Sequence, residues 1–252
     1  MYTRIKTVQE IEDMRKSGKI LASVHRKLIK EVVPGINTQY LADIAEKEIK
    51  KLGGSPAFLG YGHPIPFPSV ICISVNDEVV HGIPSKEKML KNSDIVSLDL
   101  GVTYNGMITD AAVSVVCGDG NPKVQDFLDD TKKSLNIGLR QLKNGCQVGD
   151  IGFAIQNYLE SKNYGVVRDL VGHGVGHEVH EDPNIPNFGK KGTGPKLVSG
   201  MTLAIEPMAT LGGHSVYIKN DGWTVATNDG SLSAHFEHTV LVTDNGFEIL
   251  TN

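Results

Sequence analysis

Hydrophobic positions near the start of the chain repeat with the spacing of an amphipathic helix. Over residues 7–33 they fall along one stripe, at Ile11, Met14, Leu21, Val24, Leu28 and Val32. Thr7 and Glu10 have the spacing of a capping box, in which each residue satisfies a backbone N–H of the other. Pro34-Gly35 follows the pattern and cannot continue it. We therefore predict a helix over residues 7–33.

The same order of elements occurs twice along the chain. A short helix is predicted from Asn37 or Thr38 to Gly53-Gly54, a long one from Asn121-Pro122 to Asn144-Gly145, and another short one over residues 148–165. Aligning Gly145 with Gly35 also aligns the apolar positions of the two short helices, placing Ile151, Ala154, Ile155 and Leu159 on Leu41, Ile44, Ala45 and Ile49. Long helix, glycine turn, short helix and strands in each half predict an internal duplication.

Strand patterns follow the first pair of helices. "ICISVNDEVVHGIP" (71–84) is strand-like, and "IVSLDLGVTYNGMITDAAVSVV" (95–116) contains Asn105-Gly106, a strong signal for a two-residue hairpin turn. If Tyr104 faces Met107, then Asp99 lies opposite Ala112 and Asp110 lies opposite Gly101. Asp99 and Asp110 are then diagonal neighbours on one face of the hairpin.

The two faces of this hairpin differ in character. The face of Asp99 and Asp110 otherwise carries small or polar residues, at Ser97, Gly101, Thr103 and Ser114, and the opposite face carries Leu98, Leu100, Val102, Ala111, Val113 and Val115. Two carboxylates in such a segment are either surface acids on a solvated face or buried groups that must be neutralised. A shared proton, Arg or Lys partners from elsewhere, or a metal could neutralise them.

Composition and charge set the class of protein. The chain has 252 residues, 40% hydrophobic, with a formal net charge of −4. The lysines are scattered, so neither DNA nor an anionic membrane is indicated as a partner. No signal core and no run of about 18 apolar residues occurs, so we expect a cytoplasmic protein. Cys72, Cys117 and Cys146 lack CxxC spacing and are expected to be buried, reduced thiols.

The second half offers partners for the two aspartates. "GHGVGHEVHEDP" contains His173, His177 and His180, and Glu206 and Glu237 are each expected in an apolar strand. Four carboxylates and one imidazole form an oxygen-rich set that suits a pair of divalent ions such as Mn, Fe, Co or Zn. Four negative charges would balance two such ions.

The ordered series Asp99, Asp110, His173, Glu206, Glu237 lies within "DLG", "TDAAVS", "GHGVG", "IEP" and "FEHTV". With "SVNDEVVHGIP" before it, this series closely resembles the bacterial type I methionine aminopeptidases, over nearly the whole chain. The resemblance implies an α+β, pita-bread fold with two pseudo-symmetric αβ halves around a central antiparallel sheet. It also implies a single catalytic domain over residues 1–252, with halves of about 1–120 and 121–252.

The resemblance implies roles for individual residues. Asp99, Asp110, His173, Glu206 and Glu237 would bind two divalent ions (Co, Mn, Fe, Zn or Ni), with Asp110 and Glu237 shared between them. His81 and His180 would contact the scissile amide and its tetrahedral intermediate. Our hypothesis adds that Glu206 acts as the acid–base group and that His180 stabilises the oxyanion. His177 is expected at the surface or behind the ligands.

The implied reaction is removal of the N-terminal methionine from nascent proteins and peptides, favouring a small second residue. Tyr61, Phe67, Cys72 and Trp223 would form the methionine pocket, with Phe58 and Val179 as further wall residues. The segment Gly62–Pro66 is about three residues longer than the typical form, so the loop over the pocket is expected to differ. A cytoplasmic monomer with transient ribosome association would also follow from the family, although no basic patch for ribosomal RNA is visible.

Two other functions remain open on the sequence. An Xaa-Pro peptidase would share the fold and the ligands, but such enzymes usually carry an N-terminal domain before the first ligand. A binding protein that kept the fold and lost catalysis would typically lack ligands, whereas this chain has all five.

Overall fold

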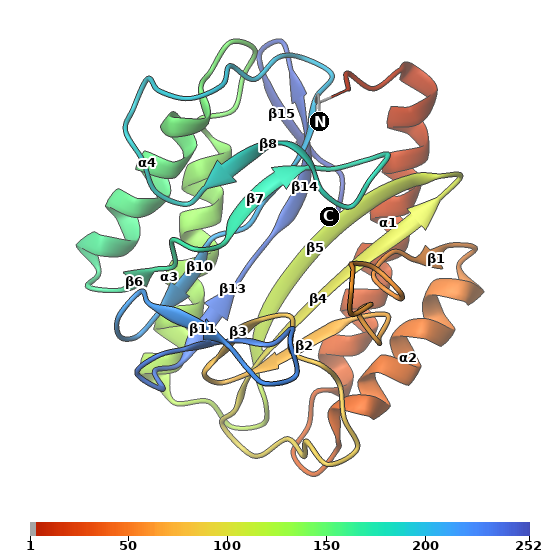
Figure 1. Cartoon of the computed structure of the whole chain (residues 1–252), viewed down its shortest axis with the longest axis vertical. Coiled ribbons are helices and arrows are strands. Elements are labelled where there is room, and N and C mark those ends of the chain that lie inside the picture. Colours follow the sequence, from red (N-terminus) through yellow and green to blue (C-terminus); the bar gives the residue numbers. More distant parts are fainter. Residues whose placement is uncertain (1–3) are drawn as a thin grey trace.

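Four helices lie on one side of the sheets in the computed structural model, which describes residues 4–252 (Figure 1). They are α1 (Val8–Glu31), α2 (Thr38–Lys51), α3 (Pro122–Leu139) and α4 (Val148–Ser161). The predicted caps are confirmed. Thr7 and Glu10 form the capping box of α1, and the Asn37 side chain accepts the N–H of Tyr40 at the start of α2.

The predicted end of the second long helix is wrong. α3 stops at Leu139 rather than at Asn144-Gly145, because the next N–H groups tighten onto nearer carbonyls. The N–H of Gln141 binds the Gly138 oxygen and that of Leu142 binds the Leu139 oxygen, both at 3.0 Å. Such i→i+3 bonds end an α-helix in a tighter turn.

The strands are mostly short. Their bounds are β1 (Ser55–Pro56), β2 (Cys72–Val75), β3 (Glu78–Val80), β4 (Ile95–Tyr104), β5 (Met107–Val116), β6 (Gly165–Val166), β7 (Val171–Gly174), β8 (Glu181–Pro186), β9 (Thr202–Ile205), β10 (Met208–Thr210), β11 (Val216–Ile218), β12 (Val225–Thr227), β13 (Ser233–His235), β14 (His238–Thr243) and β15 (Gly246–Ile249). The strand-like segment 71–84 is therefore two strands, separated by a turn in which Asn76 has φ 59°.

Two larger antiparallel sheets meet in the middle of the molecule. One contains β1, β4 and β2, with β5 paired to β4, and the other has the order β15-β14-β9-β7-β8. Two three-stranded sheets, β13-β10-β6 and β11-β12-β3, lie beside them. In Figure 1, α1 and α2 flank the first large sheet and α3 and α4 flank the strands of the second half.

The register predicted for the β4–β5 hairpin is confirmed. Tyr104 pairs with Met107, Asp99 with Ala112 and Gly101 with Asp110. Asn105 and Gly106 have φ values of 49° and 80°, as a two-residue turn of this kind requires. The turn thus places both aspartates on the face that points away from α1 and α2.

The two halves repeat each other in their turns as well as their helices. The N–H of Gly35 binds the Leu90 oxygen at 2.9 Å, and the N–H of Gly145 binds the Leu197 oxygen at 2.7 Å. Isolated bridges at the starts of α2 and α4, Asn37 with Met89 and Gln147 with Lys196, also correspond. Each half has its own apolar core, one around α1, α2 and β4 and the other around α3, α4, β9 and β14.

A few hydrogen bonds join the halves between β5 and β14. The N–H of Glu237 donates to the Ala112 oxygen at 2.9 Å. The N–H of Asp110 donates to Thr239 Oγ1 at 2.8 Å, and that hydroxyl donates to the Asp110 oxygen at 2.7 Å. Asp110 and Glu237 are therefore held side by side by the contact that unites the halves.

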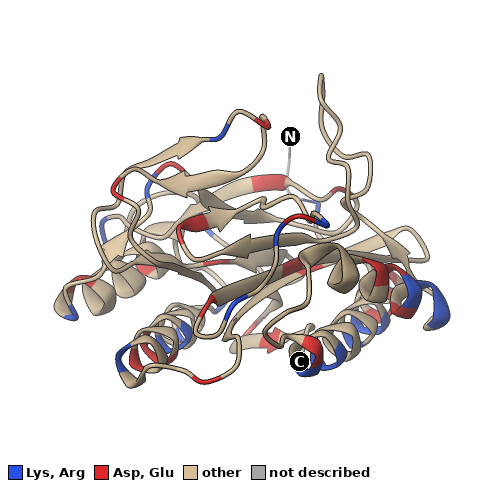
Figure 2. Cartoon of the chain, turned by 90° about the horizontal axis from the view of Figure 1, so that it is seen from below, with Lys and Arg blue, Asp and Glu red and all other residues tan. Residues whose placement is uncertain are grey.

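The outer surface carries charge of both signs. Figure 2 shows Lys and Arg interspersed with Asp and Glu along the helices, while few charges lie on the strands. None of the helices in residues 4–252 has the length and apolar character needed to cross a membrane.

The turn at Gly106 offers a test of the register. Gly106→Val should lower the free energy of unfolding by about 1–3 kcal/mol, because a β-branched residue is strained at φ 80°. It should also weaken metal binding by disturbing the spacing of Asp99 and Asp110. Urea unfolding and metal titration measure the two effects.

The matched control is Gly246→Val. An added Cβ meets nothing within 4 Å at either glycine, and only Gly106 has the left-handed φ. Equal losses of stability in the two variants would contradict the role of the turn, and unchanged metal affinity in folded Gly106→Val would contradict its control of ligand spacing.

Candidate active site

A polar cavity of about 100 Å³ lies where the two halves meet. It is lined by side chains from both halves, namely Val80, His81, Asp99, Asp110, Leu170, Val171, His173, His180, Glu206, Met208 and Glu237. The cavity thus brings together all seven residues expected to bind metal or to take part in catalysis.

Different elements deliver these side chains. Asp99 lies in β4, Asp110 in β5 and His173 in β7. Glu206 and Glu237 were expected inside strands, and this is wrong. Glu206 comes directly after β9, where Pro207 has no N–H to continue a ladder, and Glu237 lies between β13 and β14. The N–H of Glu237 is free of its own ladder and can reach across to Ala112.

The four acids share a poorly hydrated site. Asp99, Asp110 and Glu237 are buried, and the Glu206 side chain is 12% exposed. Burial, followed by the charges of neighbouring acids, holds the pKa values of Asp99, Glu206 and Glu237 well above their usual range. Burial raises the pKa of Asp110 to about 7. In the described part of the chain, Glu206 lies near His173 and His235, and no Lys or Arg forms an ion pair with any of the four acids.

His173 is oriented as a metal ligand. Its Nδ1 lies 2.9 Å from the Gly174 oxygen, and since a carbonyl only accepts, this nitrogen carries the proton. The lone pair is then on Nε2, which lies 3.5 Å from Glu206 Oε1. Burial lowers the pKa of His173 to about 3, so the ring is neutral near pH 7, as metal binding requires.

The donor atoms fit divalent metal ions. Buried oxygens of Asp99, Asp110 and Glu237 have no hydrogen-bond partner among the described residues. Ligand atoms of Asp110, His173 and Glu237 lie within 4.8 Å of one another. Orphaned carboxylate oxygens in a buried site are costly unless something binds them. Oxygen donors with one imidazole suit ions such as Mn²⁺, Fe²⁺, Co²⁺ or Zn²⁺.

His81 and His180 lie between this cavity and a second one. His81 follows β3 with φ 58°, a strained conformation of the kind found at functional sites. Burial and then His180 lower the pKa of His81 to about 4, and burial lowers the pKa of His180. The hydroxyl of Tyr61 is hydrogen-bonded to His180 Nδ1, and the His173 and His180 rings have centroids 4.3 Å apart.

The second cavity is an apolar pocket of about 50 Å³. Its lining contains every residue expected for a methionine pocket, with both histidines at its edge: Phe58, Tyr61, Phe67, Cys72, His81, Val179, His180 and Trp223. Cys72 pairs with Asp99 across β2 and β4, so neighbouring strands supply one wall of the pocket and one acid of the cavity.

The loop over this pocket is held by Trp223. The indole Nε1–H donates to the Ile65 oxygen at 3.1 Å, within the segment Gly62–Pro66. Below it, the N–H of Phe67 donates to the Tyr61 oxygen at 2.7 Å. Trp223 therefore ties the segment Gly62–Pro66 to the loop between β11 and β12.

His177 lies outside both cavities. It is half-buried, with Nε2 2.7 Å from Glu10 Oε1 and its backbone N–H 2.6 Å from Glu181 Oε1. Lys6 forms a buried ion pair with the other oxygen of Glu181. His177 thus helps to tie the histidine-containing segment to the first turn of α1.

His235 was not singled out from the sequence. It is 1% exposed, its Nε2 lies 3.4 Å from Glu206 Oε2, and neither ring nitrogen has a hydrogen-bond partner among residues 4–252. Glu206 therefore lies between the imidazoles of His173 and His235. The sequence does contain one indication of its role. His235 lies two positions before Glu237, so in a continuous strand the two side chains would point to the same face.

Four nearly buried acids, a neutral imidazole and an adjoining apolar pocket define the site of a metal-dependent hydrolase. The family model described as "Metallopeptidase family M24" matches residues 12–244. The chain therefore belongs to metallopeptidase family M24, a membership that implies use of a divalent metal ion.

Several proteins similar to this chain are described as methionine aminopeptidases. The chain is 48% identical to the methionine aminopeptidase of Clostridium acetobutylicum, over 98% of both chains, and 46% identical to methionine aminopeptidase 1 of Bacillus subtilis, again over 98% of both. The crystal structure of methionine aminopeptidase from Thermotoga maritima matches with a TM-score of 0.97 at 47% identity, covering 100% of both chains.

More distant structures share the fold. The prolidase of Pyrococcus horikoshii matches with a TM-score of 0.78 at 25% identity, covering 99% of this chain and 64% of the prolidase. The predicted fold class, an α+β pita-bread fold with two pseudo-symmetric halves, is confirmed by these neighbours.

The raised pKa values predict an unusual pH dependence of the metal-free protein. Asp110 has an ordinary pKa of 3.8 and a folded pKa of about 7. Its contribution to stability is complete below the unfolded value and is lost as the pH rises through the folded value. Between these two values Asp110 holds a proton in the folded state and not in the unfolded state, so it lowers stability by up to about 1.4 kcal/mol per pH unit.

The informative quantity is the difference in stability between the unaltered protein and Asp110→Asn. Buried histidines with lowered pKa values, about 3 for His25, His173 and His235 and about 4 for His81 and His238, make the stability of both proteins rise toward neutral pH, and this shared effect cancels in the difference. Urea unfolding with a chelator should show the unaltered protein losing stability relative to Asp110→Asn as the pH rises from about 4 to about 7, with little further change above. A difference that stays constant or changes in the opposite direction over this window would contradict the assignment.

Proposed function

We propose that this chain removes the N-terminal methionine from proteins and peptides by hydrolysing the first peptide bond. The observation that most supports this proposal is that the two cavities share His81 and His180 in their walls. One cavity offers metal ligands, and the other offers an apolar pocket for a side chain. The names of the relatives support the same activity. A small second residue in the substrate is proposed from the family resemblance alone.

We infer that the cavity holds two divalent ions. Asp99 would bind one, His173 and Glu206 mainly the other, and Asp110 and Glu237 both. The charge supports this number, since four carboxylates balance two 2+ ions in a site that contains no other neutralising cation among the described residues. When bound, the ions would supply an activated water and polarise the scissile carbonyl. Co, Mn, Fe, Zn and Ni all remain candidates.

The protein groups then move and hold protons. Glu206, at the edge of the cavity, would accept a proton from the attacking water and pass it to the departing amine. If Tyr61 donates its hydroxyl proton to His180 Nδ1, the proton of the neutral ring is on Nε2. His180 Nε2–H would then donate to the developing oxyanion, and His81 would hydrogen-bond near the departing amide.

The apolar pocket would accept the methionine side chain. Its wall is made of aromatic and small apolar groups, and an unbranched thioether suits a narrow pocket of this kind. A substrate held there would place its free α-amine in the acidic cavity, which explains a requirement for a chain terminus.

We further propose that residues 1–252 act as one catalytic domain, because the cavity takes side chains from both halves. Action on nascent chains by a cytoplasmic monomer that associates transiently with the ribosome is part of the same proposal. It is supported by the family resemblance and by the absence of a membrane-crossing helix in residues 4–252.

Glu206→Gln tests the acid–base role. The amide keeps the shape of the carboxylate but cannot accept the proton, so kcat/KM for a Met-Ala-Ser peptide should fall by about 100-fold or more in Mn²⁺ or Co²⁺. Glu160→Gln makes the same change at an exposed ion pair with Arg168 and should leave kcat/KM unchanged. Equal activity of Glu206→Gln and the unaltered enzyme, at matched metal content, would refute the role.

One set of assays separates the candidate functions. Metal-loaded protein should release methionine from Met-Ala-Ser and leave an Xaa-Pro peptide intact. Cleavage of the Xaa-Pro peptide instead would identify a prolidase-like enzyme. Metal binding with neither activity would identify a binding protein.

A further inference from the structure

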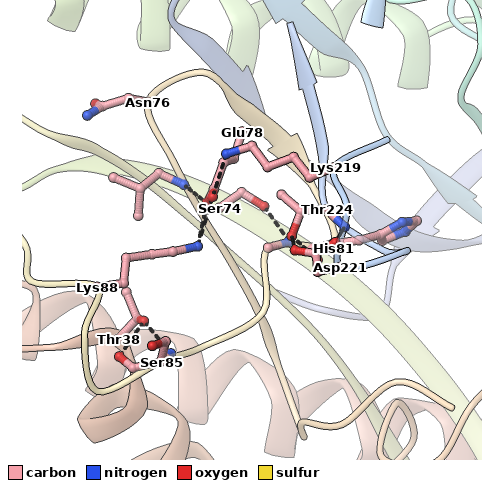
Figure 3. A network of polar contacts seen from close by, with 12 residues as sticks. Thr38, Ser74, Asn76, Glu78, His81, Ser85, Lys88, Lys219, Asp221 and Thr224 are labelled. Atoms are coloured by element: carbon pink, nitrogen blue, oxygen red, sulfur yellow. Dashed lines mark hydrogen bonds and ion pairs between the residues drawn. The ribbon is translucent and has the colours of Figure 1, made fainter. Parts of the chain in front are cut away.

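Glu78 is a buried acid three positions before His81, and its side chain binds two lysines. Glu78 begins β3, and its side chain is 7% exposed. Its oxygens accept Lys88 Nζ at 2.7 and 2.9 Å, Lys219 Nζ at 3.0 Å and the N–H of Val75 at 3.0 Å (Figure 3). A carboxylate buried this deeply depends on such partners, and removing one leaves an uncompensated charge.

Lys219 connects Glu78 to the turn that contains Trp223. Lys219 follows β11, and its N–H donates to the Thr224 oxygen at 2.7 Å, closing the loop between β11 and β12. Inside the loop, Asp221 Oδ1 accepts the N–H of Trp223 at 2.9 Å and that of Thr224 at 2.8 Å. The loop is thus rigid within itself, and its position depends on what holds it to the rest of the protein.

Backbone pairing holds this loop only weakly. β12 and β3 are three residues each, and their register shifts between Val225 and Ala226. Thr224 Oγ1 lies 3.4 Å from the His81 oxygen, a long contact, while the same hydroxyl donates to Asp221 Oδ2 at 2.6 Å. The ion pair between Lys219 and Glu78 is therefore the strongest contact between the loop and β3.

Lys88 connects Glu78 to a different part of the protein. The backbone oxygen of Lys88 accepts the N–H of Thr38 at 3.0 Å, and Thr38 Oγ1 accepts the N–H of Ser85 at 2.9 Å. Figure 3 shows Thr38 and Ser85 on the far side of Lys88 from the Trp223 loop. Lys88 thus connects Glu78 to the start of α2, and its side-chain hydrogen bonds among the described residues go to Glu78 and not to the Trp223 loop.

Trp223 is the residue through which the position of the Lys219 loop can change the shape of the apolar pocket. Its indole lies 5.3 Å from the Phe67 ring and 5.9 Å from the His81 ring, centroid to centroid. It also lines the apolar pocket. A shift of the loop would therefore change the outline of the pocket while leaving the metal ligands in place.

We propose that Glu78 and Lys219 are positioning residues that fix Trp223 over the apolar pocket and so determine how closely the pocket fits the first side chain of the substrate. This inference rests on the proposed function of the pocket. The ion pair does not touch the reacting atoms, so its loss acts on KM and on side-chain selectivity more than on kcat.

The natural probe is Trp223 itself, because it is the one tryptophan of the chain. In the metal-loaded enzyme without substrate, Lys219→Met should increase quenching of its fluorescence by acrylamide. KM for Met-Ala-Ser should rise about fivefold with kcat within about twofold, and the preference for methionine over norleucine should fall. Lys219→Arg keeps the charge and should restore both readouts.

Lys88→Met is the matched control, since it removes the other lysine of the same carboxylate. It should lower the melting temperature while leaving quenching and KM unchanged. Arg15→Met removes a more exposed ion pair, with Glu248, on α1 and should likewise leave quenching and KM unchanged. Unchanged quenching and KM in folded Lys219→Met, or equal changes in Lys88→Met, would overturn the proposal.

The two proposals fail separately. Quenching needs no substrate, so a change in Lys219→Met with no methionine release by the unaltered enzyme would keep the positioning role and reject the substrate. Methionine release with unaffected quenching and KM in Lys219→Met would keep the substrate and reject the positioning role.

Discussion

The structure depends on keeping four carboxylates together in a place that water hardly reaches. Each of Asp99, Asp110, Glu206 and Glu237 is costly to bury as an anion, and the charges of the two aspartates add to the cost for both glutamates. Without a cation the site can persist only by holding protons, which is why the pKa values are high. Divalent ions offer the alternative, because carboxylates that repel one another when charged together attract a cation strongly. The stability of the fold and the chemistry of the site are thus two results of one electrostatic constraint.

The arrangement of the halves follows from this constraint. Neither half contains enough ligands for a metal pair, since the aspartates belong to the first and the glutamates and His173 to the second. Their apolar cores are largely separate, and the connection at Asp110, Ala112, Glu237 and Thr239 consists of a few hydrogen bonds. Corresponding turns at Gly35 and Gly145 follow the long helix and precede the short one in each half, so that two similarly built units present their acids to each other.

Much of this could be predicted from the sequence because the signals were local. Asn105-Gly106 determines the hairpin register, the caps at Thr7 and Asn37 determine helix starts, and the family resemblance identified the residues that the cavity brings together. The errors lie where tertiary contacts decide. Turn hydrogen bonds end α3 at Leu139, earlier than predicted. Glu206 lies just outside its strand because Pro207 follows it, and Glu237 lies outside a strand because its N–H binds the Ala112 oxygen. The sequence pattern does not predict the roles of His235 and Glu78, because their partners Glu206 and Lys219 are distant in sequence or in another strand and come near only in the folded chain.

The bond from Glu237 to Ala112 lies at the junction of the two halves, beside the residues that would hold the metal. Smaller apolar clusters and the pairing of β3 with β12 also cross this junction, but the ligands there are costly to keep together without a cation. A metal ion bound in the cavity would join ligands of both halves and so stabilise the junction. Removal of the ion would therefore lower the free energy of local opening there, and the segments around Asp110 and Glu237 would become more open to hydrogen exchange and proteolysis.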